Sequence, residues 1–321
     1  MNVLGLQGSP RKGNTCFLLS EFMCAAEKLG AAVVAVDVQE KNILPCTECR
    51  VCETCGFCPI DDDMTAEVYM LLREADVVVM ASPVFFYSVP AQLKALIDRS
   101  QVLWARRYLL GLEDPGRRWR KGFLLSLGAT RGKRLFDGIR LTAEYFFDAV
   151  GARFAGELVY RGIEHLGDME KQEGAAADIE KAVKELLHPF RLRKKILFVS
   201  TDNACRSQMA VAFAQRLFGD RLDCLSAGIR PAAQVNPAMV SVMEEKGMDM
   251  AFRRTRSLDV VLQNGLPDVV VIMGPGGICP PVSGAVREHW DIPDHAGGSL
   301  DDARRVRDEI EKKVVERITQ I

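Results

Sequence analysis

Short apolar runs alternate with helical segments along almost the whole chain. The first five runs that we interpret as buried strands are residues 2–7, 31–38, 76–81, 122–128 and 152–160. Each run is too apolar to have a solvent-facing side, and helical periodicity separates one run from the next. Alternation of this kind favours a parallel sheet that is covered by helices on both faces. The sequence therefore predicts a doubly wound α/β domain with a five-stranded sheet over residues 1–187.

A second, shorter series of the same kind follows the stretch HPFRLRKK at residues 188–195. This stretch combines a proline with a basic run between two periodic segments, as is typical of a domain boundary. We predict a linker at residues 188–194. The strand runs of the second series are residues 195–200, 222–228 and 267–274. Because 321 residues are long for one core and suit two, a second, smaller α/β domain is predicted over residues 195–321.

The composition argues against several classes of partner. The net charge of -1 gives no bulk electrostatic attraction to nucleic acid or to an anionic membrane. The first residues lack a basic segment followed by an apolar core, and no stretch approaches about 20 uninterrupted apolar residues, so neither a signal peptide nor a membrane span is expected. Ten cysteines without an export signal indicate a reducing compartment. We therefore predict a cytoplasmic protein that binds neither nucleic acid nor membranes.

The first apolar run passes through the loop Gly8–Thr15 into a helical segment. A strand, a small-residue loop and a helix start gather backbone N–H groups and the positive helix end at one point, which favours an anion such as phosphate. Arg11 could add charge. Hydrogen bonds could come from the side chains of Ser9, Asn14 and Thr15. The loop lacks the spacing of a Walker A sequence, and a turn with a helix cap is the alternative interpretation.

Three loops of the first domain are expected at the carboxyl ends of strands, namely residues 8–15, 82–89 and 128–133. In an open parallel sheet, ligands bind outside these ends, at the point where the strand order reverses. The middle loop contains three aromatic residues in a row. They either pack in the core or offer a flat apolar surface to a planar ligand. We predict a ligand site built from these three loops.

Five cysteines occur at every third position from Cys46 to Cys58. A buried structural cysteine acts as a small hydrophobic residue and needs no neighbours of its kind. Closely spaced thiolates on an irregular loop can instead bind one soft metal centre. An iron–sulfur cluster and a tetrahedral zinc ion both accept four such ligands, so the spacing alone does not choose between them. Metal-free thiols are the third interpretation, and disulfides are not expected in a reducing compartment.

Three separated motifs of the first domain point to one family. They are GSPRKGNT, PCTECRVCETCGFCPIDDDM and ADVVVMASPVFFYSVPAQLKALIDR. The domain resembles the NADPH-dependent FMN reductase family of flavodoxin-like proteins, and the cysteine run makes it most similar to the iron–sulfur flavoprotein branch. The resemblance implies that the FMN phosphate is bound by Ser9, Arg11, Asn14 and Thr15. It also implies that the isoalloxazine ring lies against Pro83, Val84, Phe85, Phe86, Tyr87 and Ser88, with Gly128 nearby.

Members of this branch carry a Cx2Cx2Cx4–7C pattern that holds a 4Fe-4S cluster. The pattern is reproduced here, with a five-residue last gap, by Cys46, Cys49, Cys52 and Cys58. Cys55 is an additional thiol, which we expect to be spare. The resemblance implies FMN, NAD(P)H or a ferredoxin-type electron donor, and a homodimer or homotetramer. A flavin exchanges both electron pairs and single electrons, so it can connect a hydride donor to a cluster, and no catalytic acid or base is nominated.

The second domain carries four further motifs in order. They are STDNACRSQMA from residue 200, SAG at 226–228, NP at 236–237 and HWDIPD at 289–294. Over nearly all of residues 195–321 the sequence is similar to arsenate reductases of the low-molecular-weight tyrosine phosphatase family. That family implies a phosphate loop with five residues between a cysteine nucleophile and an arginine. The implied oxyanion-binding residues are Ser200, Asn203, Cys205, Arg206, Ser207 and Asp294, the last in the place of the general acid.

The nucleophile position, however, is occupied by Ser200. A serine hydroxyl stays protonated there, because the motif has no adjacent base, whereas a thiol ionises readily in such a loop. We therefore interpret the second domain as a degenerate module that binds an oxyanion such as phosphate or arsenate. Cys279 resembles one of two further cysteines of the reductases, and MGPGG at 273–277 replaces the region of the other. Cys205 and Cys279 are either redox thiols or core residues.

Two alternative functions follow from the second domain. In one, the chain is chiefly a sensor that binds phosphate, arsenate or a phosphorylated partner. In the other, it reduces arsenate with electrons from the flavin in place of the missing thiol. Both remain open on the sequence alone.

Overall fold

The computed structural model of the chain describes residues 1–263, 265–274, 279–294 and 298–318. The backbone separates into two compact units. The first contains Met1–Gly111 and Arg118–Arg191, and the second contains Leu112–Arg117 and Leu192–Ile321. None of the described helices is both long enough and apolar enough to cross a membrane.

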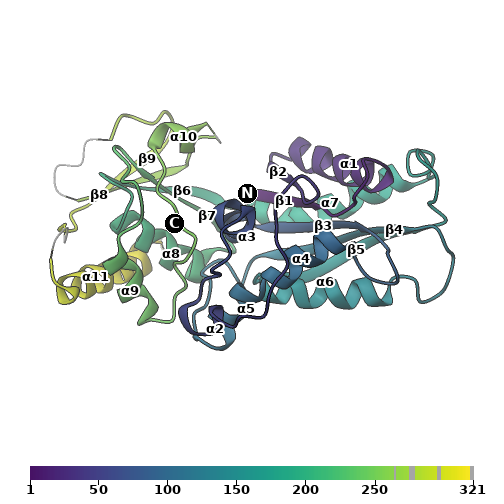
Figure 1. Cartoon of the computed structure of the whole chain (residues 1–321). Coiled ribbons are helices and arrows are strands. Elements are labelled where there is room, and N and C mark those ends of the chain that lie inside the picture. Colours follow the sequence, from purple (N-terminus) through teal and green to yellow (C-terminus); the bar gives the residue numbers. More distant parts are fainter. Residues whose placement is uncertain (264, 275–278, 295–297, 319–321) are drawn as a thin grey trace. The chain divides into compact units, whose positions relative to one another are not determined.

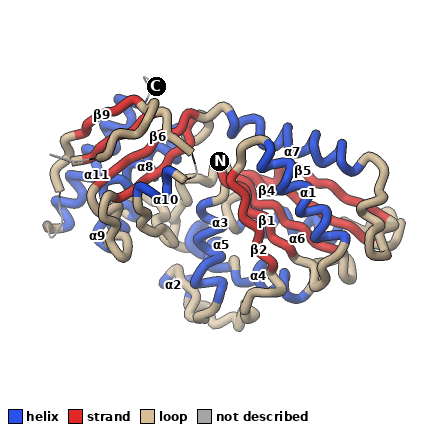
Figure 2. The backbone as a smooth tube through the Cα atoms, turned by 90° about the horizontal axis from the view of Figure 1, so that it is seen from above, coloured by secondary structure: helices blue, strands red, loops and turns tan. Residues whose placement is uncertain are grey.

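The first unit is built on a parallel sheet with the strand order β2-β1-β3-β4-β5 (Figures 1 and 2). Its strands are β1 (Asn2–Gln7), β2 (Ala32–Asp37), β3 (Val77–Pro83), β4 (Lys121–Gly128) and β5 (Arg153–Arg161). The order reverses between β1 and β3, which is the switch point of flavodoxin-like folds. The prediction of a flavodoxin-like, five-stranded parallel sheet is confirmed.

Helices cover both faces of this sheet, because its strands are apolar on both sides. α1 (Asn14–Lys28) and α7 (Ala175–Arg191) lie on one face, and α4 (Ala91–Arg99) and α6 (Asp137–Ala149) lie on the other (Figure 1). The buried residues of α1 and α7 share one apolar core with β1, β3 and β4. The remaining helical segments are α2 (Cys52–Cys55), the π-helix η1 (Met64–Val68), α3 (Tyr69–Glu74) and α5 (Gln101–Tyr108).

α7 continues beyond the predicted end of the first domain. It includes residues 188–191 of the predicted linker, and β6 begins at Lys194, so two residues separate the elements. The helix continues because Leu187 and Phe190 are both buried and prolong its apolar stripe. The basic residues that suggested a linker therefore lie partly on a helix.

The second unit has a parallel sheet with the strand order β7-β6-β8-β9. Its strands are β6 (Lys194–Ser200), β7 (Leu222–Gly228), β8 (Val269–Met273) and β9 (Val286–Trp290). The sequence predicted the first three. β9 was missed because it is an edge strand with the sequence VREHW, of which only Trp290 is buried, so it lacks the apolar run that marks the others. The prediction of a second, smaller α/β domain is confirmed.

Successive residues of β6 enter two different cores. Ile196 and Phe198 belong to the core formed with α8 (Arg206–Phe218), α9 (Pro237–Glu244) and α11 (Leu300–Ile318). Leu197 and Val199 belong to the core formed with α10 (Leu258–Leu262). This division follows from the period of two in a strand, which sends alternate side chains to opposite faces. Because both faces of β6 pack in an apolar core, its sequence is an uninterrupted apolar run.

The segment Leu112–Arg117 belongs to the second unit, although its neighbours in sequence belong to the first. The Glu113 N–H donates to the Gly247 carbonyl at 2.8 Å, and the Asp249 N–H donates to the Glu113 carbonyl at 2.9 Å. These bonds form a parallel bridge between Glu113 and Met248. The chain therefore enters the second unit twice, which no sequence pattern had indicated.

Candidate flavin, thiol and oxyanion sites

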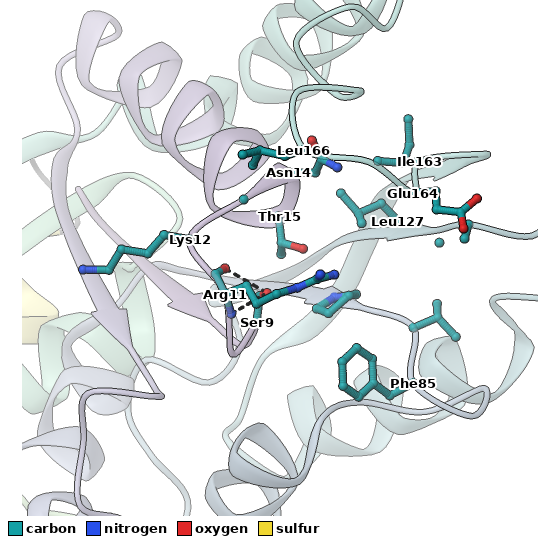
Figure 3. A pocket seen from close by; sticks show the side chains of 15 residues that line it. Ser9, Arg11, Lys12, Asn14, Thr15, Phe85, Leu127, Ile163, Glu164 and Leu166 are labelled. Carbon is teal, nitrogen blue, oxygen red and sulfur yellow. Dashed lines mark hydrogen bonds between the residues drawn. The ribbon is translucent and has the colours of Figure 1, made fainter.

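A cavity of about 420 Å³ lies at the carboxyl ends of β1, β3 and β4 (Figure 3). The predicted FMN-binding residues that line it are Ser9, Arg11, Asn14, Thr15, Pro83, Val84, Phe85 and Gly128. Lys12, Gly13 and Ala129 also line the cavity and lie in two of the loops predicted to form the ligand site. The lining residues that sequence reasoning missed are Leu127, Ile163, Glu164 and Leu166. The last three follow the carboxyl end of β5, so the rule that placed the other loops could also have found this one.

The start of α1 presents backbone N–H groups to this cavity. Gly13 is the N-cap, no described side chain caps the helix, and its first turn contains no acidic residue. The N–H groups of that turn and the positive helix end can therefore receive an anion. The Arg11 side chain extends toward the interior of the cavity, whereas Lys12 points away (Figure 3) and pairs with Glu40 at 2.8 Å. This end of the cavity fits a phosphate group.

Gly8 and Ser9 determine the course of the loop. A Cβ atom at Gly8 would lie 2.4 Å from the Leu93 Cδ2 atom and 3.0 Å from the Ala81 carbonyl oxygen, so a larger residue would have to displace the buried Leu93 side chain. The Ser9 hydroxyl donates to the Arg11 carbonyl at 3.0 Å and accepts from the Arg11 N–H at 3.2 Å. In this arrangement the Ser9 side chain holds the loop together.

Asn14 fastens the loop after β5 to the start of α1. Its Nδ2 donates to the His165 carbonyl at 2.8 Å, and its Oδ1 accepts from the N–H groups of Gly167 at 3.1 Å and Met169 at 3.2 Å. The fastened segment supplies the wall of the cavity that the sequence had not indicated. The side chain expected to bind phosphate is thus engaged in positioning this wall.

Asn14→Ala is expected to weaken FMN binding roughly tenfold, because three hydrogen bonds of about 1 kcal/mol each hold the wall in place. Titration of flavin-free protein with FMN, followed by quenching of flavin fluorescence, measures the effect. Asn14→Asp keeps an acceptor oxygen but places a negative charge at the phosphate end and against the His165 carbonyl oxygen, so it should bind FMN no better than Asn14→Ala. Equal affinity in all three proteins would contradict this role.

The aromatic residues after β3 form a tight hairpin turn. Phe85 and Ser88 exchange two backbone hydrogen bonds of 2.9 Å. Phe86 and Tyr87 lie between them with φ values of 47° and 62°, a region that costs a non-glycine residue about 1–3 kcal/mol. Both side chains are exposed. Among the described residues, this turn contributes Phe85 to the cavity lining, whereas the predicted contacts Phe86, Tyr87 and Ser88 lie outside it.

The five clustered thiols lie on the loop between β2 and η1. Cys52 and Cys58 are partly buried, whereas Cys46, Cys49 and Cys55 are exposed. Burial raises the pKa of the Cys52 thiol, and the thiols of the other predicted ligands, Cys58, Cys46 and Cys49, raise it further. The Cys55 thiol donates to the carbonyl of its neighbour Phe57 at 3.4 Å. The other three predicted ligands therefore lie near enough to Cys52 to affect its pKa.

The ligand geometry of a metal centre is not yet formed on this loop. In the part of the chain that the structure describes, no three His, Cys, Asp or Glu side chains come close enough together to bind one metal ion. The donor chemistry of the four thiols nevertheless fits a soft metal centre. Binding would have to draw the exposed Cys46 and Cys49 toward the partly buried pair.

The second unit places three predicted oxyanion-site residues together after β6. The hydroxyl oxygens of Ser200 and Ser207 are 2.8 Å apart. The Asn203 N–H donates to the Ser200 hydroxyl at 3.1 Å, and the Asn203 Nδ2 donates to the Ser207 hydroxyl at 2.8 Å. The Asn203 Oδ1 accepts from the Arg256 N–H at 2.9 Å, which holds Asn203 at a φ of 54°. The loop is therefore fully formed around the serine.

Arg206 begins α8 beside this loop. Its Nη2 donates to the Asp294 carboxylate at 3.0 Å, and its Nη1 donates to the Ile292 carbonyl at 3.1 Å. A Cβ atom at Gly274 would lie 2.4 Å from the same Nη1 atom, so the backbone there approaches the guanidinium closely. The predicted arginine and the residue in the place of the general acid are thus paired.

Cys205 and Cys279 are both buried. Burial raises the pKa of the Cys205 thiol far above its ordinary value, Asp202 and Asp294 raise it further, and Arg206 lowers it only in part. Burial likewise raises the pKa of Cys279. Both thiols are therefore protonated near neutral pH, which favours the interpretation as core residues. Of the MGPGG segment, residues 275–277 lie outside the described residues.

Comparison with known proteins agrees with both halves of the structure. The NADPH-dependent FMN reductase family matches residues 1–135, and the low molecular weight phosphotyrosine protein phosphatase family matches residues 195–321. An iron-sulfur flavoprotein of Methanosarcina thermophila is 38% identical over 132 residues, which are 41% of this chain and 65% of that protein. A second, from Methanocaldococcus jannaschii, is 41% identical over 104 residues, which are 32% of this chain and 53% of that protein.

An arsenate reductase of Bacillus cereus is 36% identical over 124 residues, which are 38% of this chain and 92% of that protein. The chain thus spans less than two thirds of either flavoprotein and nearly all of the arsenate reductase. The first match includes β1 to β4 of the five-stranded sheet, and the second includes the four-stranded sheet from Lys195 onward. The second domain therefore belongs to the low molecular weight phosphotyrosine protein phosphatase family of the arsenate reductases, and the first domain, which the NADPH-dependent FMN reductase family matches, is similar to iron-sulfur flavoproteins.

Proposed function

We propose that the chain is an FMN-dependent oxidoreductase that receives electrons from a nicotinamide or ferredoxin-type donor and passes them singly through a 4Fe-4S cluster. The observation that carries the proposal is the cavity at the switch point of the first sheet. Its phosphate end combines a helix start with Arg11, and Phe85 lies across it from Thr15 (Figure 3). A ligand with a planar apolar ring and an anionic tail would match this cavity, which has an anion-binding end and an aromatic side chain across from it.

The residues of the cavity would hold FMN in a defined orientation. Backbone N–H groups of the 8–15 loop and Arg11 would bind the phosphate, while Pro83, Val84 and Phe85 would support the ring. Leu127, with Ile163 and Leu166 of the wall fastened by Asn14, would keep water from the ring. When bound, FMN exchanges two electrons with a nicotinamide and single electrons with a cluster.

The second cofactor would be held by the thiolates of Cys46, Cys49, Cys52 and Cys58. Four thiolates are the usual ligand set of a 4Fe-4S cluster, which supplies one-electron transfer. The support for this set is the spacing of the four cysteines on one loop, together with the similarity of residues in the first unit to iron-sulfur flavoproteins.

Protein purified without oxygen should contain flavin, iron and acid-labile sulfide, and NADH or NADPH should bleach the flavin absorbance. Protein without flavin would contradict the assignment of the cavity. Protein with flavin but without iron and sulfide would contradict the cluster alone. Zinc in place of iron would indicate that the cysteine loop is a structural zinc site.

A second candidate function is supported by the intact loop around Ser200. The loop keeps its hydrogen bonds and its arginine but has a hydroxyl in the place of the nucleophile. Such a loop would bind phosphate, arsenate or a phosphorylated partner without covalent chemistry, so the second domain would serve as a sensor or docking module. Reduction of arsenate by flavin electrons is the alternative, and the protonated, buried Cys205 argues against a thiol step in it.

Arg206→Met is expected to weaken phosphate binding by about 10–100-fold, because hydrogen bonds to a charged group are worth about 1.5–3 kcal/mol. Isothermal calorimetry with phosphate and arsenate measures the affinities. Arg216→Met provides the matched control, since Arg216 lies on the same helix and donates to the Lys246 carbonyl away from the loop. Absence of binding in wild-type protein would remove the oxyanion function.

Three further expectations stay predictions. A homodimer or homotetramer is expected from the resemblance, and sedimentation equilibrium tests it. The cytoplasmic location and the absence of nucleic-acid and membrane partners rest on the sequence alone. Cell fractionation and binding assays with DNA and anionic vesicles would test these.

A further inference from the structure

A buried ion pair joins Asp62 to Arg99 in the first unit. The Arg99 Nη1 lies 2.6 Å from one carboxylate oxygen and its Nη2 lies 3.0 Å from the other, so the pair is bidentate. Both side chains are 0% exposed. Burying two charges is unfavourable unless additional hydrogen bonds satisfy their remaining polar groups. The groups that supply these hydrogen bonds show which segments of the chain the ion pair holds in place.

Besides the Met64 N–H, which donates to Asp62 at 3.0 Å, the additional partners lie at the two ends of the cysteine loop. The Leu44 N–H donates to Asp62 at 2.9 Å, and the Leu44 carbonyl accepts from Arg99 at 2.9 Å. The Ile60 carbonyl accepts from the Arg99 Nη2 at 3.3 Å. Leu44 is two residues before the first clustered cysteine, and Ile60 is two residues after the last. The ion pair therefore ties together the points at which the loop leaves and rejoins the domain.

The neck, which we define as residues 42–44 and 60–63, contains a second set of bonds. The Asn42 N–H donates to the Asp63 carboxylate at 2.7 Å, and the Asp63 N–H donates to the Asn42 carbonyl at 3.1 Å. The Tyr69 hydroxyl donates to the Arg99 carbonyl at 2.7 Å, which fixes the end of α4. The neck is thus closed by side chains and backbone together.

The tip of the loop has its own contact with the same helical layer. The Arg106 Nη1 donates to the Gly56 carbonyl at 3.2 Å, and the guanidinium carbon lies 5.0 Å from the centre of the Phe57 ring. Gly56 has a φ of 72°, and a Cβ atom there would lie 2.3 Å from the Arg106 Nη1. Only glycine therefore allows this contact. The tip is supported from α5, and the two chain ends are held at the neck.

We propose that Asp62 and Arg99 are positioning residues for the metal centre, which close the neck so that the two ends of the cysteine loop are held together before metal binds. The inference rests on the proposed cluster. Without the tie, the segment 46–58 would have to be closed by the metal itself, and part of the binding free energy would be lost to chain entropy. With the tie, binding has only to draw in the exposed thiols.

The decisive variant is the double substitution Asp62→Asn/Arg99→Met. It removes both charges, so neither is left buried without its partner and the fold is expected to persist. FMN content and circular dichroism, which report on the cavity and on the fold, should match wild type. After anaerobic reconstitution, the variant should release iron to a chelator at least about tenfold faster, as found for residues that orient metal ligands. Arg99→Lys keeps the charge and loses the bidentate geometry, so it should also release iron faster than wild type.

Arg107→Met is the matched control. It removes an arginine of α5 that pairs with Asp148 at 2.9 Å on the surface, away from the neck. Iron release from this variant should equal that of wild type. Iron release from Asp62→Asn/Arg99→Met at the wild-type rate would overturn the proposal.

A measurement on metal-free protein separates this inference from the proposed cluster. The thiols of Cys52 and Cys58 are partly buried, and opening the neck should make them react with a disulfide reagent at least about fivefold faster, as expected for local opening. This assay decides the neck proposal even if wild-type protein contains no iron. Unchanged thiol reactivity in Asp62→Asn/Arg99→Met would refute it.

Discussion

Cys58→Ser is expected to leave the protein with almost no bound iron and sulfide, whereas Cys55→Ser should keep the full complement. A 4Fe-4S cluster needs four thiolates, and a serine hydroxyl is neither soft nor ionised at neutral pH, so loss of one ligand is not compensated. Cys58 is partly buried and acts on Cys52 electrostatically. Cys55 is exposed and donates to the Phe57 carbonyl.

Iron, acid-labile sulfide and flavin are measured on each anaerobically prepared variant. Serine variants of Cys46, Cys49 and Cys52 should behave as Cys58→Ser does. Flavin content should be unchanged in all of them, because the cavity is built from other loops. Loss of the cluster from Cys55→Ser would show that Cys55 is a cluster ligand and not the spare thiol. Retention of the cluster in Cys58→Ser would show that Cys55 replaces it.

Ser200→Cys is expected to give the second domain a reactive thiolate. The new sulfur would take the place of a hydroxyl that accepts from the Asn203 N–H and contacts the Ser207 hydroxyl. With Arg206 beside the loop, these donors favour the charged form, so a thiol pKa of about 3.5–7.5 is expected in place of about 8.5. The wild-type serine has no such ionised form.

Alkylation by iodoacetamide as a function of pH, with the modified residue located by mass spectrometry, measures this pKa. The variant should also hydrolyse p-nitrophenyl phosphate, which wild-type protein should not do, and phosphate should protect it from alkylation. Ser200→Cys/Arg206→Met is the control and should show a higher thiol pKa. An ordinary thiol pKa in Ser200→Cys would mean that the loop no longer supports anions.

The sequence motifs located residues but could not assign their contacts. Asn14 lies where the family resemblance implied a phosphate ligand, yet its amide is engaged with residues 165–169, about 150 positions away. Phe86 and Tyr87 belong to the expected flavin loop, yet their positive φ values turn them out of the cavity. In each case the motif correctly predicted the loop in which the residue lies. The role depended on a backbone geometry that the sequence does not display.

The sequence by itself determined the parallel strands of both sheets except β9, the three loops at the carboxyl ends of strands and the serine at position 200, because periodicity and motifs are local patterns. Only the tertiary structure decided the second entry of the chain at Leu112–Arg117, the edge strand β9, the wall after β5 and the neck closed by Asp62 and Arg99. Each of these depends on contacts between residues far apart in the chain, and an isolated Asp or Arg on a helix or loop looks like an ordinary surface charge until its burial and its partner are known.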